Sequence, residues 1–172
     1  MSLHIIIDGY NLIRQSAELS RLDRRDLERG RDALIDQLAE YKRMRGHAIT
    51  VVFDAGNGIH QSRQKAFVKG IRIIYSGRGE LADTVIKHMA ARERQRAAVV
   101  SSDNDIAAYC RACGCATLPS AEFEQRLMMA ALGKDEQADA AASGWVPTTR
   151  KKGPARRLPK SERRRRRTIG KL

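Results

Sequence analysis

Short apolar runs alternate along the chain with longer segments in which apolar residues recur at helical spacing. The runs are rich in β-branched residues and end in turns or polar loops, which predicts buried strands at residues 3–7, 48–53, 71–75, 97–100 and 116–118. The amphipathic segments predict helices at residues 26–45, 80–96, 106–112 and 121–132. Buried strands that alternate with helices predict an α/β fold, with helices on both faces of a mostly parallel sheet.

Acidic side chains gather where the predicted strands end. The positions are Asp8, Asp54, Glu80, Asp83, Asp103 and Asp105. Parallel strands direct their carboxyl ends to one edge of the sheet, where such folds bind ligands. Neighbouring strands lie about 4.8 Å apart. We therefore expect several of these carboxylates to approach a common point.

A group of carboxylates without a counter-charge is electrostatically costly, so a cation is expected among them. Hard oxygen ligands select Mg²⁺ or Mn²⁺, which bind carboxylates together with substrate phosphate. This combination predicts metal-assisted hydrolysis of a phosphodiester. Asn11 follows Asp8 by three residues, and its amide is positioned to orient a metal-bound water or to contact a phosphate.

Each acidic residue also has a purely structural explanation. Asp103 suits the N-cap of the next helix, and Asp105 is favoured there by the helix dipole. Glu80 and Asp83 begin another predicted helix, and Asp54 suits a turn. The functional interpretation depends on the coincidence of independent acidic positions at the binding edge.

Four motifs occur in order within about the first 130 residues: IIIDGYNLI at 5–13, VVFDA at 51–55, GELADT at 79–84 and VVSSD at 99–103. Together they resemble the YacP-like branch of the NYN domains, within the PIN-like ribonuclease superfamily. The resemblance implies a three-layer α/β/α PIN-like fold, a divalent metal and endonucleolytic cleavage of RNA. It also implies a link to translation and to mRNA decay on the ribosome. It assigns catalysis to Asp8, Asn11, Asp83 and Asp103, with Asp54 at the edge of the metal site. Glu80 and Asp105 fit the geometry of the metal site but are not obligatory ligands.

The positive charge is concentrated near the end of the sequence. The net charge is +13, and residues 150–172 hold twelve of the 33 basic residues against one of the 20 acidic ones. We expect a nuclease domain at 1–132, a linker at 133–149 and a disordered basic tail at 150–172 that binds RNA or the ribosome. The RNA-binding residues expected in the tail and on the body are Arg163, Arg164, Arg165, Arg63, Lys65, Arg78 and Lys87.

Several other classes of protein are disfavoured. The apolar runs are too short to span a membrane and no signal segment is present, so we expect a cytoplasmic protein. Cys110, Cys113 and Cys115 are expected to be reduced thiols, because a structural zinc site needs four ligands and no histidine is near. A dinucleotide-like pattern at 77–82 follows the wrong strand, and the phosphatase-like Asp-Asn-Asp at 103–105 lies late in the chain. No pattern indicates an oligomeric state.

The function predicted from the sequence is that of a divalent-metal-dependent endoribonuclease. Two alternatives remain open. One is a non-catalytic RNA- or ribosome-binding protein in which the acidic residues are helix caps. The other is a phosphatase that acts on small substrates.

Overall fold

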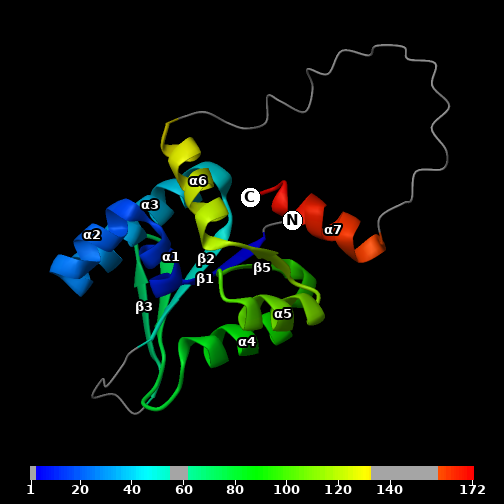
Figure 1. Ribbon diagram of the computed structural model, residues 1–172, viewed down its shortest axis with the longest axis horizontal. Helices are drawn as coiled ribbons and strands as arrows, with labels where there is room; N and C mark the ends of the chain where they lie inside the picture. The colour runs from blue at the N-terminus through cyan, green and yellow to red at the C-terminus, as the bar shows by residue number, and fades with distance from the viewer. Residues whose placement is uncertain (1–2, 55–61, 133–158) are drawn as a thin grey trace.

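The computed structural model describes residues 3–54, 62–132 and 159–172. This part of the chain contains a six-stranded sheet in the order β3-β4-β2-β1-β5-β6 (Figure 1). The strands are β1 (His4–Asp8), β2 (Ala48–Phe53), β3 (Gln64–Val68), β4 (Ile71–Tyr75), β5 (Ala97–Val100) and β6 (Ala116–Leu118). Neighbouring strands are parallel except β3 and β4, which are antiparallel. The predicted α/β fold with a mostly parallel sheet is confirmed.

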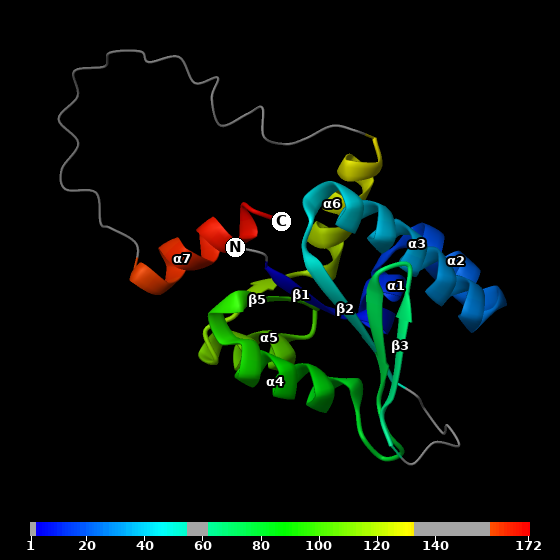
Figure 2. The same cartoon turned by 180° about the vertical axis from the view of Figure 1, so that it is seen from behind.

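Helices cover both faces of the sheet, which gives three layers (Figures 1 and 2). One face carries α1 (Gly9–Gln15), α2 (Ala17–Arg25), α3 (Leu27–Arg45) and α6 (Ser120–Ala131). The other carries α4 (Ala82–Glu93), which continues into the short 3-10 helix η1 (Arg94–Arg96), and α5 (Asn104–Ala112). Among the described residues, no helix is both long enough and apolar enough to cross a membrane.

Strand β1 lies at the centre of the sheet, between β2 and β5. Ile5 and Ile7 are buried in the core beneath α1, α3 and α6, whereas Ile6 is buried in the core beneath α4 and α5. A strand covered on both faces requires such a continuous apolar run. The same register brings the carboxyl ends of β1, β2 and β5 to one edge of the sheet.

Strand β3 and helix α2 are among the elements that were not predicted from the sequence. Every residue of β3 is exposed, so this edge strand has no alternation of buried and exposed positions. It joins β4 through Lys69 and Gly70, which both have positive φ angles, of 50° and 81°. Helix α2 was missed because only Leu19 of its nine residues is buried. Both elements are placed by pairing and packing with neighbours rather than by their own pattern.

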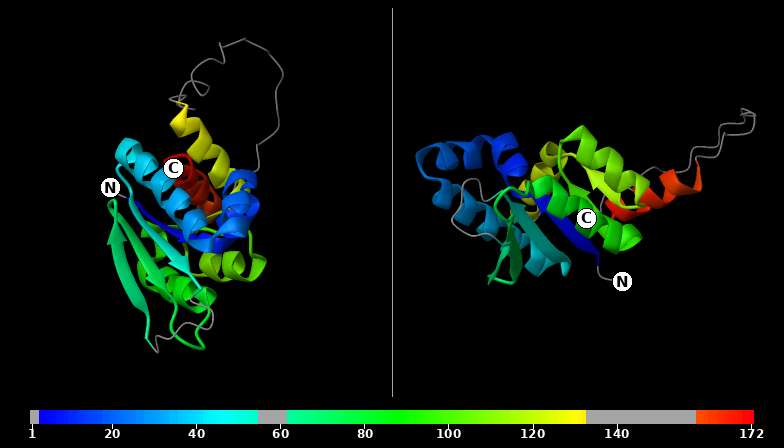
Figure 3. Two further views of the ribbon diagram at one scale, coloured as in Figure 1. Left: turned by 90° about the vertical axis from the view of Figure 1, so that its left-hand side faces the viewer. Right: turned by 90° about the horizontal axis from the view of Figure 1, so that it is seen from below.

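The structure also differs from the expectation of a disordered basic tail. Lys160–Ile169 form helix α7, which lies along β6 at the opposite end of the sheet from the β3–β4 hairpin (Figure 3). Leu172 is buried in the core and its carbonyl accepts a hydrogen bond from the Tyr41 hydroxyl. The apolar Ile169 and Leu172 thus anchor a segment whose composition alone indicates disorder. The expected linker at 133–149 and the tail residues 150–158 lie outside the described residues.

Candidate active site

Asp8 ends β1 and caps the N-terminus of α1. Its Oδ1 accepts a hydrogen bond from the backbone N–H of Asn11 at 3.2 Å, and its Oδ2 accepts one from Ser101 Oγ at 3.1 Å. The next residue must be a glycine, because a Cβ at Gly9 would lie 2.3 Å from a ring carbon of the buried Phe53. The Asp-Gly pair therefore places a carboxylate where the backbone turns closely over β2.

Ser101 connects the carboxylate of Asp8 to the backbone of Asp103. It directly follows β5, donates through Oγ to Asp8, and accepts at the same oxygen from the backbone N–H of Asp103 at 3.1 Å. Asp103 caps α5, because its Oδ1 accepts from the backbone N–H groups of Asp105 at 2.7 Å and Ile106 at 3.1 Å. One buried hydroxyl thus fixes the end of β1 relative to the start of α5.

Asn11 connects a third element to this edge. Its side-chain oxygen accepts hydrogen bonds from the backbone N–H of Ser102 at 2.9 Å and from Ser120 Oγ at 2.7 Å. Because a backbone N–H meets this oxygen, the orientation of the amide is determined. The amide nitrogen donates to no group in the described part of the chain, so it is the end of the side chain that a ligand can use.

Asp83 lies in the first turn of α4 and completes the group. Burial raises the pKa of Asp83, and repulsion by Asp103 raises it further, while Lys87 opposes the shift. Burial also raises the pKa of Asp8; its hydrogen bonds from Asn11 and Ser101 act against this shift, and the charges of Asp83 and Asp103 add to it. Asp8, Asp83 and Asp103 are therefore near enough to repel one another.

The other three acidic residues predicted for the site have different partners. Both carboxylate oxygens of Glu80 accept hydrogen bonds from Arg63, at 2.8 Å for the Nε–Oε2 pair, and this ion pair lowers the pKa of Glu80. Asp105 forms an ion pair with Lys87. Asp54, at the end of β2, accepts a hydrogen bond from Ser76 at 3.2 Å.

Among the residues that the structure describes, no three His, Cys, Asp or Glu side chains are arranged to hold a metal ion. The chemistry of Asp8, Asp83 and Asp103 nevertheless suits a hard divalent cation, because each carboxylate oxygen has lone pairs beyond those its hydrogen bonds use. A cation among them would also relieve the repulsion that raises the pKa of Asp8 and Asp83.

The predicted RNA-binding residues lie in several places. Arg63 is bound to Glu80 and Lys87 to Asp105, whereas Lys65 on β3 and Arg78 in the loop after β4 are exposed. The three arginines of α7 that were predicted to bind RNA also differ from one another. Arg163 is exposed, Arg164 donates a hydrogen bond to Gln95, and Arg165 lines a pocket of 140 Å³ together with Ser102 and Asn104.

Sequence reasoning missed one residue of this edge, Ser101, and the location of another, the predicted RNA-binding residue Arg165. Ser101 had no signal except its position directly after an apolar run, beside the acidic motif. Arg165 belongs to a segment that composition assigns to a disordered tail, yet it reaches the loop that contains Asp103. Both contributions depend on contacts between distant parts of the chain.

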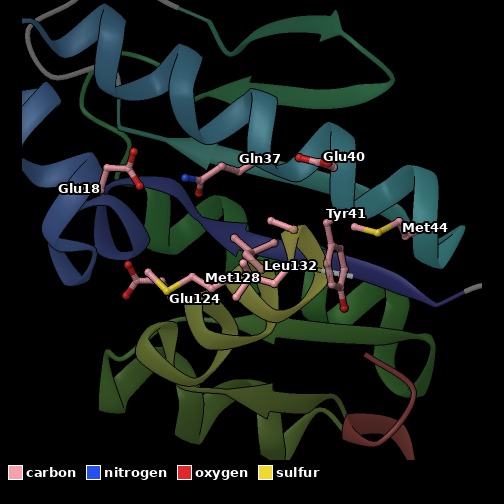
Figure 4. A pocket seen from close by; sticks show the side chains of 10 residues that line it. Glu18, Gln37, Glu40, Tyr41, Met44, Glu124, Met128 and Leu132 are labelled. Carbon is pink, nitrogen blue, oxygen red and sulfur yellow. The ribbon is translucent and has the colours of Figure 1, made fainter. Parts of the chain in front are cut away.

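Two other features lie outside the carboxylate edge. Cys110 and Cys115 are buried free thiols, as predicted, and burial raises the pKa of each to about 12. An apolar pocket of 300 Å³ opens between α3 and α6, with Met44 and Met128 in its wall and Glu18, Glu40 and Glu124 around it (Figure 4). None of the predicted site residues lines this pocket.

Comparisons with known proteins find a matching family model, a similar sequence and similar structures. The family model of the YacP-like NYN domain matches residues 5–167, a span that reaches into α7. The uncharacterized protein YacP of Bacillus subtilis (strain 168) is 33% identical over 86 residues, which span 50% of this chain and 50% of that protein. The chain thus aligns with about half the length of this curated relative.

Two crystal structures of Rae1 (YacP) from Bacillus subtilis resemble the fold. One has a TM-score of 0.63 and 25% identity over 77% of each chain. The other, of a point mutant, has a TM-score of 0.63 and 24% identity over 76% of this chain and 77% of that one. The structural similarity covers about three quarters of this chain, whereas the alignment with the curated relative covers half of it.

Proposed function

We propose that this chain, which belongs to the YacP-like NYN domain family and has a PIN-like nuclease fold, is an endoribonuclease that uses a divalent metal ion. The observation that carries this proposal is the placement of Asp8, Asp83 and Asp103 at the starts of α1, α4 and α5, on the carboxyl edge of the sheet, with Asp8 joined to the backbone of Asp103 through Ser101. Open α/β folds bind their ligands at this edge.

The metal ligands in this proposal are Asp8, Asp83 and Asp103, and the ion is Mg²⁺ or Mn²⁺. When bound, such an ion polarises a phosphoryl oxygen and lowers the pKa of the attacking water. Ser101 holds two of the three ligands in register through its single hydroxyl. Asn11 has its oxygen fixed by Ser102 and Ser120, so its amide nitrogen is directed by the protein and can orient a water or phosphate oxygen.

An anionic substrate needs cations beside these carboxylates. Lys87 neutralises Asp105 at the border of the group, and Arg165 reaches the same loop from α7. Arg78 is exposed in the loop that leads to α4. We therefore include these three residues in the surface that receives RNA, with the ribosome as a further proposed partner.

A specific observation also favours the non-catalytic alternative. Asp8 and Asp103 are good N-caps, which is a sufficient structural reason for both residues, and no ready three-ligand group is present among the described residues. A pure RNA-binding protein would need neither metal affinity at Asp83 nor the buried Ser101 bridge.

The decisive experiment follows end-labelled single-stranded RNA incubated with the wild type and with Asp8→Asn, in Mn²⁺, Mg²⁺ or EDTA. Asparagine caps a helix about as well as aspartate, so the variant is expected to fold. We expect internal cuts that need the metal and are absent from the variant. The same assay on translating ribosomes identifies activity restricted to bound mRNA. RNA binding without cleavage in both settings would establish the alternative.

A further inference from the structure

A second concave surface lies on the other side of α4 from Asp83. It is a cavity of 480 Å³ between α4 and the β3–β4 hairpin. The charged and titratable side chains in its wall are His4, Arg63, Lys65, Arg72, Arg92 and Glu93. We call this cavity the hairpin groove. Four permanently cationic side chains and one carboxylate give it a clear excess of positive charge.

Three of these cations have no ion-pair partner among the residues that the structure describes. Arg63 is bound to Glu80, and the carboxylate of Glu93 lies 3.8 Å from His4 and 3.7 Å from Arg96. Lys65, Arg72 and Arg92 form no ion pair with any residue in the described ranges. Cations that share a concave wall repel one another, and focusing of the field in a cleft attracts an anion. The described residues therefore leave the groove with a net positive charge.

The spacing of these cations suits an extended anion. Val85 and Arg92 both line the groove, and seven residues of helix span about 10 Å. On the opposite wall, Lys65 faces Ile74 across the hairpin, and Arg72 lies two residues before Ile74 on the same face of the sheet. A stacked single strand advances about 3.4 Å per nucleotide, so the groove has the length of about three nucleotides.

The groove adjoins the acidic edge. Arg63 lines one end of the groove and is bound to Glu80, which precedes Asp83 by only three residues. A chain that crosses the three carboxylates can thus continue past Arg63 along α4. The ring of Phe67 is 70% exposed and lies opposite Arg72 in the hairpin. An exposed aromatic ring beside a basic groove is the combination that single-stranded nucleic acids use for stacking and backbone contact.

We infer that the hairpin groove binds the phosphodiester backbone of single-stranded RNA on one side of the cleavage point. The inference rests on the proposed function for the class of substrate. Beyond that function, we infer that Lys65, Arg72 and Arg92 contact successive phosphates of the RNA. The affinity for RNA then depends on the position of these charges rather than on the net charge of the chain.

The test compares two triple variants of the full chain that lose the same charge. One replaces Lys65, Arg72 and Arg92 with glutamine. The matched control replaces Arg24, Arg29 and Arg43 with glutamine, because these exposed arginines lie on α2 and α3, on the other face of the sheet. Fluorescence anisotropy with a labelled oligouridylate in EDTA, at about 50 to 200 mM KCl, measures binding without cleavage. Circular dichroism checks that both variants fold.

We expect the groove variant to raise Kd at least about tenfold and to reduce the slope of log K against log salt by about 2, since each lost phosphate contact on a single strand contributes about 0.7. The control variant should change Kd by less than about twofold. Equal weakening by both variants, or an unchanged salt slope in the groove variant, would overturn the inference. Failure of the proposed function would be seen in a different measurement, as the absence of metal-dependent cleavage by the wild type.

Discussion

Ser101 Oγ donates a hydrogen bond to Asp8 Oδ2 at 3.1 Å, and at the same time accepts one from the backbone N–H of Asp103 at 3.1 Å. One hydroxyl thus links the carboxylate of Asp8 to the backbone of Asp103, 95 positions away in the sequence. The pair joins the central strand β1 to the start of α5. Ser101 is accordingly a positioning residue of the proposed active site, and it makes no contact with substrate in this proposal.

Ser101→Ala is predicted to lower cleavage about 10- to 100-fold, the usual cost of losing a group that orients metal ligands. The Ser101 hydrogen bond lowers the pKa of Asp8, so its loss raises that pKa. The acidic limb of the pH–rate profile should therefore move to higher pH. Ser101→Thr retains a hydroxyl and should restore most activity. An unchanged pH profile in Ser101→Ala would contradict the role.

The strands that could be predicted from the sequence are those that are buried and whose own residues are therefore apolar. The isoleucines of β1 meet both layers, so their apolar run directly reports their place in the sheet. The exposed strand β3 is held by its pairing with β4, and α7 is anchored by Ile169 and Leu172. Neither relationship is visible in a local pattern, because each needs a partner elsewhere in the chain.

The same distinction applies to the candidate site. Strand order makes the approach of Asp8 and Asp103 predictable, since parallel neighbours end at one edge. Glu80 is different, because its partner Arg63 is brought to it by the unpredicted hairpin. Counting acidic residues in the sequence therefore overestimates the number that is available to a metal ion.

Glu80→Gln is predicted to keep cleavage within about fivefold of the wild type, whereas Asp103→Asn should lose at least about 100-fold, equivalent to about 2.7 kcal/mol of transition-state stabilisation. The reason is that Arg63 occupies both oxygens of Glu80, while Asp103 Oδ2 accepts no hydrogen bond from the described residues. Rates on one labelled RNA under equal metal concentration measure the difference. Equal losses in both variants would assign Glu80 to the metal site.

Asp83→Asn is predicted to stabilise the fold at pH 7, with a rise in Tm of about 1 to 3 °C. Burial and repulsion by Asp103 raise the pKa of Asp83 in the folded state. The folded chain then binds more protons than the unfolded chain between the two pKa values, so stability falls as pH increases through that window. The advantage of the variant should therefore disappear below about pH 3, where aspartate is protonated in both states.

Thermal unfolding of the wild type and of Asp83→Asn also measures metal binding in the absence of RNA. A ligand that binds only the folded state raises Tm, and at a fixed ligand concentration the rise is larger for tighter binding. Mn²⁺ should therefore raise the Tm of the wild type and have a smaller effect on Asp83→Asn, and chelation should remove the difference. Equal shifts in both proteins would place the ion away from Asp83.

Native protein at pH 8 is predicted to expose one rapidly reacting thiol to an aromatic disulfide reagent. Cys110 and Cys115 are buried, and burial raises the pKa of both to about 12, so almost none of either is thiolate. Cys113 is only partly buried. Three thiols should react after unfolding, and Cys113→Ser should abolish the fast phase. Slow reaction of all three native thiols, released by a zinc chelator, would instead indicate a bound metal.

The end of the chain is predicted to contribute separately to folding and to RNA binding. The Leu172 side chain is 1% exposed within the core, so Leu172→Ala should lower the free energy of unfolding by about 2 to 3 kcal/mol. Arg163 is exposed, so Arg163→Gln should change stability by less than about 0.5 kcal/mol and reduce the salt slope of RNA binding by about 0.7. Chemical denaturation and anisotropy measure the two effects. If Leu172→Ala retained full stability, α7 would not be docked in solution, and the approach of Arg165 to the Asp103 loop would lose its structural basis.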